Sequence, residues 1–313
     1  MIIHNMNLQL NKELNGVVAL PHLGVIRAEG EEAVEFLQSQ LTQDFALLAP
    51  SQARLAAFCS AKGRMQASFI GLKRSEIEVL LVCSKDLLTP TLLRLSMFVL
   101  RAKAKLSNAT ADFSLYGLAG DAAQQGLGAA SPPWQKIEQG AVSLVSLYPA
   151  DGVSRALWLA PASEPAPLGP ALSYADWLWS EVRSGVATVS APIGEAFVPQ
   201  MLNYESIGGV NFKKGCYPGQ EVVARSQFRG VLKRRVYLAH CPQALQAGDE
   251  LFEFNDPSQP CGIVAQAAAS PHGGFDALIS IQTSASQGQL HLGSSSGPKL
   301  VLMALPYPLL DDI

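Results

Sequence analysis

The chain has 313 residues, and at ~100–200 residues per domain this length predicts two or three domains. Apolar residues make up 48% of the sequence and charged residues 16%, which excludes an intrinsically disordered chain. The formal net charge is only −3, so no overall positive field marks the chain as a nucleic-acid binder.

Cysteine usage and the first residues indicate where the protein works. The chain has five cysteines, too few for a disulfide scaffold, and the odd number leaves at least one unpaired. The first twenty residues lack the basic start and apolar run of a signal peptide. The longest apolar runs, such as 79–83, fall far short of the ~20 residues of a membrane helix. We therefore expect a reduced, soluble, cytoplasmic protein with no membrane partner.

The N-terminal part alternates strand and helix patterns. A helix is expected over 31–41, because Val34, Leu37 and Leu41 recur on one face behind an acidic first turn. Strands are expected over 17–20, 25–28, 54–59, 65–72 and 77–83. This order is typical of an α+β layer rather than a doubly wound sheet, and no glycine motif for a dinucleotide or a phosphate occurs.

A second helix is expected to end near Arg101. Thr89 has the character of an N-cap, and Pro90 that of a proline at the first helical position. The side chains expected to face inward are Leu92, Leu93, Met97 and Leu100.

The middle of the chain contains two proline-rich stretches, 131–133 and 161–170, which are predicted to be loops. The segments 141–148 and 155–159 are predicted to be strands. A helix is expected over 174–185, with Gly185 as the residue just beyond its C-cap.

The distribution of charge changes sharply near residue 235. The range 213–235 holds seven basic residues and one acidic residue, Glu221, whereas beyond it the only basic residue is Lys299. The C-terminal part consists of short alternating apolar runs separated by Gly, Pro and Ser. Such runs predict a small all-β domain, either a barrel or a sandwich.

The segment 208–221 is rich in glycine and contains a cysteine, Cys216, just before a helix expected over 218–228. A helix N-terminus and the neighbouring Lys213 and Lys214 both lower a thiol pKa, so Cys216 is a candidate reactive thiol. The alternative is a small buried cysteine in a turn, which is the commoner case for a free cysteine.

At this segment the chain resembles the K-G-C-Y-x-G-Q-E signature of the YgfZ family, folate-binding relatives of the glycine-cleavage T-protein (aminomethyltransferase). The matching residues are Lys214, Gly215, Cys216, Tyr217, Gly219, Gln220 and Glu221. The segments 36–44, 61–65 and 305–308 agree with the same family, so the resemblance spans almost the whole chain.

The resemblance implies a T-protein-like α+β fold, with two α+β subdomains and a C-terminal β-barrel around a central folate cavity. We therefore expect a ferredoxin-like folate-binding subdomain at 1–110, a second α+β subdomain with the motif at 111–232, and the barrel at 233–313. The implied ligand is tetrahydrofolate or a derivative. The implied role is the assembly or repair of iron–sulfur enzymes, including tRNA-modifying ones, through transient contacts with those enzymes and with tRNA.

One departure from the aminomethyltransferases concerns catalysis. In those enzymes an acidic residue on the strand after the glycine turn serves the folate-dependent transfer, and Gln66 matches that position here. A glutamine cannot act as a carboxylate base, so we expect no aminomethyltransferase activity. Two alternatives to a folate-binding support protein stay open: a folate-dependent one-carbon transferase or demethylase, and a tRNA-binding accessory module.

The pterin-binding positions implied by the resemblance match only in part. Two tryptophans line the pocket in some relatives; Trp177 matches one, and Leu23 occupies the place of the other. A usually acidic position falls on Arg183, with Glu181 two residues earlier. A carboxylate suits the paired N–H donors of a pterin edge and an arginine does not. The alternative for Trp177 is simple core packing.

Clustered cations are the footprint of an anion-binding surface, either for the glutamate tail of a folate or for tRNA phosphates. The candidates are Lys213, Lys214, Arg225 and Arg229. The alternative is a solvated helix face. The cysteines show no C-x-x-C pair, so we expect neither a metal site nor a cluster held by this chain alone.

Overall fold

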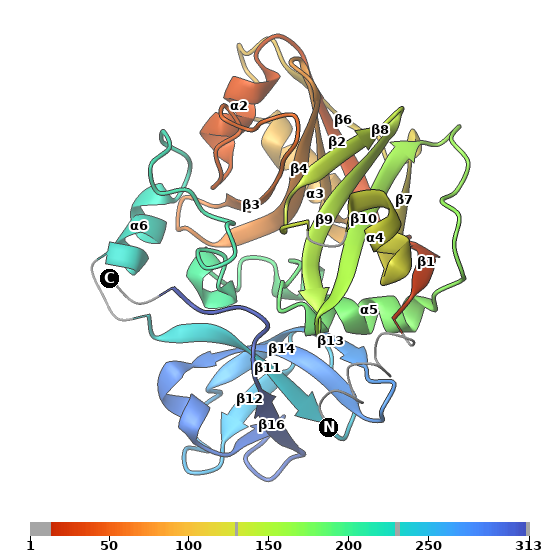
Figure 1. Ribbon diagram of the computed structural model, residues 1–313. Helices are drawn as coiled ribbons and strands as arrows, with labels where there is room; N and C mark the ends of the chain where they lie inside the picture. The colour runs from red at the N-terminus through yellow and green to blue at the C-terminus, as the bar shows by residue number, and fades with distance from the viewer. Residues whose placement is uncertain (1–13, 129–130, 229–231, 311–313) are drawn as a thin grey trace.

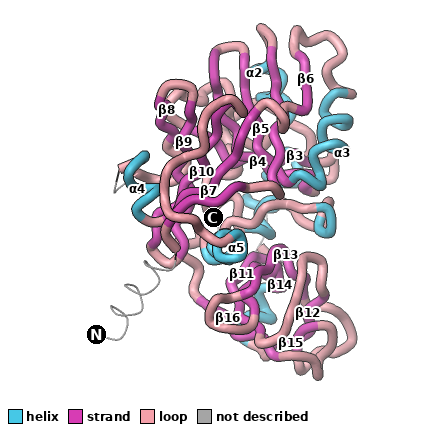
Figure 2. The backbone as a smooth tube through the Cα atoms, turned by 90° about the vertical axis from the view of Figure 1, so that its right-hand side faces the viewer, coloured by secondary structure: helices cyan, strands magenta, loops and turns pink. Residues whose placement is uncertain are grey.

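The computed structural model describes residues 14–128, 131–228 and 232–310. Within these residues the chain forms two five-stranded antiparallel sheets and one closed barrel. The two sheets lie beside each other, and the barrel, formed by the C-terminal part of the chain, lies beyond them (Figures 1 and 2). The α+β class and the C-terminal β-barrel expected from the sequence are confirmed.

The first sheet has the strand order β3-β4-β5-β2-β6 and carries two helices on one face. Along β5, Val79 and Leu81 face these helices, whereas Leu80 and Val82 face the central core, as the two-residue period of a strand requires. The elements are β2 (Leu23–Glu29), α2 (Ala33–Gln40), β3 (Ala53–Cys59), β4 (Met65–Ser75), β5 (Glu78–Ser84), α3 (Lys85–Ser96) and β6 (Lys105–Asn108).

Helix α3 corrects the expectation for this part of the sequence. The helix begins at Lys85 after Ser84, so Pro90 lies inside it rather than at its first position. Leu93 lies on the exposed side of the helix, and Met97 and Leu100 lie beyond its end at Ser96. The expectation that Leu93, Met97 and Leu100 face inward is wrong, since all three are exposed; the buried side chains are Leu88, Thr91 and Leu95.

The second sheet has the order β1-β7-β10-β9-β8. Its edge strand comes from the start of the described chain and pairs with β7, about a hundred residues later. The outer face is covered by α4, which the sequence pattern does not predict. The elements are β1 (Gly16–Ala19), β7 (Phe113–Ala119), α4 (Asp121–Leu127), β8 (Lys136–Gln139), β9 (Val142–Ala150) and β10 (Val153–Pro161).

Helix α5 (Tyr174–Arg183) lies between the second sheet and the barrel (Figure 1). Its N-cap is Ser173, whose hydroxyl accepts a hydrogen bond from the Asp176 amide at 3.0 Å. It ends before Gly185, which has φ +74°, as expected for a glycine beyond a C-cap. The segment that follows contains η1 (Ala191–Ile193), η2 (Pro199–Leu202) and α6 (Gln220–Phe228).

The barrel closes in the order β11-β14-β13-β12-β15-β16 and has its own apolar core. Trp179 of α5 joins it to the rest of the molecule, because its Nε1 donates to Asp276 Oδ2 at 2.7 Å. The elements are β11 (Arg234–Cys241), β12 (Glu250–Glu253), β13 (Gly262–Ala269), β14 (Phe275–Gln282), η3 (Thr283–Gln287), β15 (Leu290–Leu292) and β16 (Lys299–Met303).

Candidate functional site

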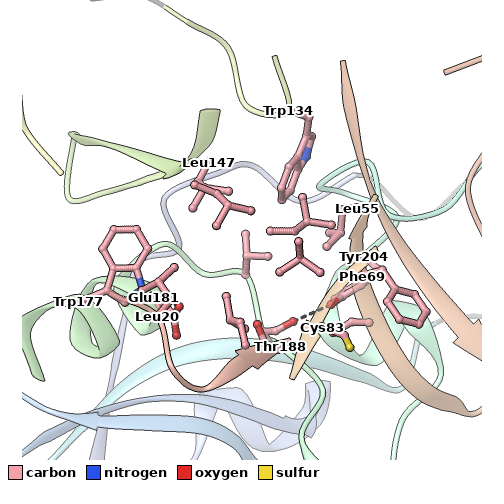
Figure 3. A pocket seen from close by; sticks show the side chains of 17 residues that line it. Leu20, Leu55, Phe69, Cys83, Trp134, Leu147, Trp177, Glu181, Thr188 and Tyr204 are labelled. Atoms are coloured by element: carbon pink, nitrogen blue, oxygen red, sulfur yellow. Dashed lines mark hydrogen bonds between the residues drawn. The ribbon is translucent and has the colours of Figure 1, made fainter. Parts of the chain in front are cut away.

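A cavity of about 60 Å³ lies where the inner faces of the two sheets meet α5. Its wall is mostly apolar, with side chains such as Leu55 and Leu147 contributed by the sheets (Figure 3). Glu181 of α5 is the carboxylate in this wall. A second cavity of about 50 Å³ adjoins it and shares Trp134, Leu147 and Glu181 as walls.

The carboxylate of Glu181 is held by three donors from three parts of the chain. Its Oε1 accepts hydrogen bonds from His22 Nε2 at 3.1 Å and from Trp177 Nε1 at 2.9 Å. Its Oε2 accepts one from Gln266 Nε2 of β13 at 3.3 Å. Trp177 and Glu181 can bond because residues four apart lie on one face of a helix. The orientation of the carboxylate is therefore fixed before any ligand arrives.

The same neighbours keep Glu181 ionised. Burial raises the pKa of this carboxyl, but the bond and charge of His22, the charge of Arg155 and the bond from Trp177 together hold its pKa below the ordinary value. At neutral pH the cavity therefore contains a negative charge in an apolar wall.

Arg155 of β10 lines the second cavity and is buried, with 3% of its surface exposed. Its guanidinium carbon lies 4.4 Å from the centre of the Trp177 ring. Burial lowers the pKa of Arg155 to about 10, with the charge of Glu181 opposing the shift, so the group remains a cation at neutral pH. The cavities therefore hold one buried charge of each sign.

The structure places both pterin-binding residues expected from the sequence, Leu23 and Trp177, in the cavity wall. Trp177 is fully buried. One side of its ring packs on Gly117 of β7, where an added Cβ would lie 2.6 Å from three ring atoms, and Arg155 covers the ring as well. The ring thus supports Glu181 and Arg155 instead of offering a bare stacking surface.

Arg183, the other departure noted in the sequence, points away from the cavity. Its guanidinium makes two hydrogen bonds to Asp151, at 2.6 and 2.7 Å, and an ion pair with Asp276 at 3.6 Å. The carboxylate on this helix that faces the cavity is Glu181, two residues earlier.

Strand β4 contributes no carboxylate to the cavity. Gln66 does not line it; its Nε2 donates to Glu195 Oε1 at 2.6 Å near the surface. The polar residue of β4 that does line it is Ser68, whose hydroxyl accepts a hydrogen bond from the Val189 amide at 2.9 Å. On β4, Ser68 rather than Gln66 is therefore the polar side chain that lines the cavity.

The K-G-C-Y motif packs against the turn between β3 and β4. An added Cβ at Gly219 would meet the backbone of Gly63 and Ser60 at 2.4–2.7 Å, and Gly219 has φ +81°, so only glycine fits there. Tyr217 is buried, and Cys216 is exposed. Cys216 lines neither of the two cavities.

Lys214 is committed to the interior of the chain. Its ammonium donates to the carbonyl oxygens of Leu41, at 2.6 Å, and Gln38. Burial lowers the pKa of Lys214 to about 8, and the nearby Asp44 and Cys216 oppose the shift. The expectation that Lys214 meets an external anion is therefore not supported, because its ammonium is already bonded.

The other anion-binding candidates have different surroundings. Lys213 and Arg225 are exposed, and Arg229 lies outside the described residues.

In the described ranges no group of three His, Cys, Asp or Glu side chains could hold a metal ion. No helix in the described part of the chain is long and apolar enough to cross a membrane.

The two sheets and the C-terminal barrel form a T-protein-like fold. The aminomethyltransferase T of the glycine cleavage system from Bartonella henselae has a similar structure, with a TM-score of 0.66. The two chains are 16% identical, and the match covers 97% of this chain and 89% of the other. At this level of identity the likeness shows the fold alone.

Sequence relatives identify the family. A tRNA-modifying protein YgfZ from Edwardsiella ictaluri is 30% identical over 300 residues, 90% of this chain and 89% of the relative. The protein of the same name from Photorhabdus laumondii is 27% identical over 309 residues, 95% of this chain and 93% of the relative. No protein-family model matches the chain. The chain belongs to the YgfZ family.

Sequence reasoning missed several residues of the cavity. Arg155 lies in a segment predicted only as a strand, and the contact of Gln266 with Glu181 depends on how the barrel packs on α5. Glu181 could have been assigned to the cavity, because it follows Trp177 by one helical turn.

Proposed function

We propose that the protein binds tetrahydrofolate or a derivative, with the pterin ring in the cavity beside Glu181. In the bound state it supports the assembly or repair of iron–sulfur enzymes in the cytoplasm, including enzymes that modify tRNA. The observation that carries the proposal is a buried, ionised carboxylate with a fixed orientation in an otherwise apolar wall. Such a site suits a flat ring with paired N–H donors.

The cavity must enlarge for a bicyclic ring to enter. A space of about 60 Å³ holds a few waters, and the adjoining space of about 50 Å³ shares wall residues with it, among them Trp134 and Leu147. Trp134 is a wall of both, is half-buried, and is tethered through Nε1 to Ile207 O at 3.0 Å. Rotation of this ring would merge the two spaces.

The proposed role does not include aminomethyl transfer. The described wall of the cavity has Ser68 on β4, and a hydroxyl cannot replace the carboxylate that assists transfer in the T-proteins. An exposed Cys216 outside the cavity fits a contact with a client protein better than chemistry on a buried folate. Cys216→Ser should therefore keep folate binding and lose support of iron–sulfur enzymes.

Titration with tetrahydrofolate under anaerobic conditions tests ligand binding, with tryptophan fluorescence as the readout. Trp134 and Trp177 line the cavity, so occupancy should change the emission. Glu181→Gln should weaken binding by ~10-fold or more, because hydrogen bonds to a charged group are lost. Glu195→Gln, an exposed carboxylate outside the cavity, is the control and should bind as the wild type does. A wild-type protein that binds no folate at millimolar concentration would refute the proposal.

A tRNA contact is a second proposal, and it is carried by the exposed cations of the motif region. Lys213 and Arg225 are both exposed and have no carboxylate partner in the described residues. Charge reversal of both should lower tRNA affinity and its salt dependence, as measured by filter binding. Equal binding by the wild type and the double variant would exclude this surface.

A further inference from the structure

Arg155 has more hydrogen-bond donors than the protein uses. A guanidinium carries five N–H donors. In the described part of the chain its hydrogen bonding is limited to one contact, from Nη1 to Tyr148 O at 3.4 Å, and its buried Nε has no partner. A buried charged donor without partners is costly, so an arginine placed at a cavity indicates an acceptor that arrives with a ligand.

Glu181 lies in the wall of the same cavity and offers the opposite chemistry. Its two oxygens only accept hydrogen bonds, and three protein donors leave Oε2 with capacity for a further one. The charges of Arg155 and Glu181 influence each other, yet no direct ion pair joins them among the described residues. The space between them is therefore bounded by donors on one side and acceptors on the other.

A flat ring that satisfies both residues needs N–H donors next to a carbonyl oxygen. The pterin of a folate has this edge: the 2-amino group and N3–H would face Glu181, and the 4-oxo group would face Arg155. We propose that Arg155 is the residue that selects the 4-oxo form of the ring and rejects a 4-amino form, which presents N–H donors to a group that can only donate. This inference rests on the proposed folate-binding function.

The same edge occurs in guanine, whose 2-amino, N1–H and 6-oxo groups have the same order. The shared chemistry is thus a lactam carbonyl flanked by N–H donors, and the source of the ring has to be distinguished experimentally. A pterin and a guanine differ in their ring systems and in what is attached to them, so folic acid and guanosine separate the two sources.

The test compares folic acid with aminopterin, which differ in a 4-oxo or a 4-amino group and in the N3–H that only the 4-oxo ring carries. Calorimetric titration of the full-length wild-type protein with each should show at least ~10-fold tighter binding of folic acid, the effect of one hydrogen bond to a charged donor. Equal or tighter binding of aminopterin overturns the inference while leaving folate binding intact.

Variants of Arg155 then test whether this side chain causes the preference for folic acid over aminopterin. Arg155→Met should lower the ratio of the two affinities and leave only the part that comes from the N3–H, which the 4-amino ring lacks opposite Glu181. Arg155→Lys, which still only donates, should keep a ratio close to that of the wild type. The control is Arg74→Met, because Arg74 likewise makes one bond to a carbonyl, Ala141 O at 3.4 Å, and contacts one aromatic ring outside the cavities. Arg74→Met should keep the wild-type ratio.

The ratio is measured on one preparation, so partial unfolding of a variant cancels from it. An unchanged ratio in Arg155→Met would assign the preference elsewhere and overturn the inference. Binding of guanosine without folic acid would keep the role of Arg155 and point to a purine ligand, and the tetrahydrofolate titration described above would then decide the folate function. If the wild type binds neither folic acid, aminopterin nor guanosine, the inference fails, while the proposed function stands or falls with the tetrahydrofolate titration.

Discussion

The contact between Gly117 and Trp177 is the point at which the cavity can be disturbed without touching its polar groups. An alanine Cβ at position 117 would lie 2.6 Å from three atoms of the Trp177 ring, where ordinary contacts are 3.4–4 Å. The ring cannot move aside freely, because its Nε1 is bonded to Glu181 and Arg155 covers it. Gly117→Ala therefore forces the ring, the carboxylate or the strand to shift.

The expected decrease in the free energy of unfolding of Gly117→Ala follows from overpacking a closed core. Inserting one methyl group where no space exists typically destabilises a protein by ~1–3 kcal/mol. Trp177 is fully buried, so the value should lie in the upper half of this range. Because the displaced ring also carries the hydrogen bond that orients Glu181, folate affinity should fall in parallel with the free energy of unfolding.

Urea denaturation followed by circular dichroism measures the first effect, and folate titration the second. Gly194→Ala is the matched control, because Gly194 has φ −56° and the nearest atom to an added Cβ is 3.5 Å away. It should change the free energy of unfolding by less than about 0.5 kcal/mol. If Gly117→Ala is as stable as Gly194→Ala, the ring is not held as rigidly as described, and the argument for a fixed carboxylate fails.

Three further predictions concern thiols, pH and chemistry. Cys216 should be alkylated first among the cysteines at pH 7, as mapped by mass spectrometry, because it is exposed while burial raises the pKa of Cys59 and Cys83 to about 12; equal labelling of all five would contradict this. The contribution of Glu181 to folate affinity should be constant from pH 8 to about pH 5, because the pKa of this carboxyl is lowered in the folded protein. The negative charge of Glu181 is present throughout this range and is lost only as the pH falls through the lowered pKa. A midpoint near pH 7 in the pH dependence of folate binding would indicate another group. Aminomethyl transfer from the lipoyl carrier to tetrahydrofolate should be absent, because β4 presents Ser68 to the cavity; robust turnover in that assay would show that the carboxylate is not needed.

Much of the architecture could be predicted, because in the barrel and at the end of α5 the local sequence pattern favours the same structure as the tertiary packing. The alternating runs beyond residue 235 form the barrel, and helix α5 ends before Gly185, as its sequence indicates. Helix α3 could not be predicted correctly, because Thr89-Pro90 has the composition of a helix start but the chain already turns at Ser84. Tertiary packing there tolerates a proline inside the helix.

The cavity was only partly predictable, for a physical reason. Trp177 and Leu23 were assigned through family resemblance, and both line the cavity. Arg155 and Gln266 come from strands whose sequence pattern reports only that they are strands. Their polar ends meet Trp177 and Glu181 through the packing of β10 and the barrel against α5, which depends on contacts distant in sequence.

The most direct test of the account is a crystal structure of the protein with 5-formyltetrahydrofolate, a stable reduced folate. The account predicts the pterin ring between the two sheets, with its N–H edge on the Glu181 carboxylate and its 4-oxo group toward Arg155. A pterin bound elsewhere, or a cavity in which Glu181 keeps only its protein partners while folate occupies another surface, would contradict it.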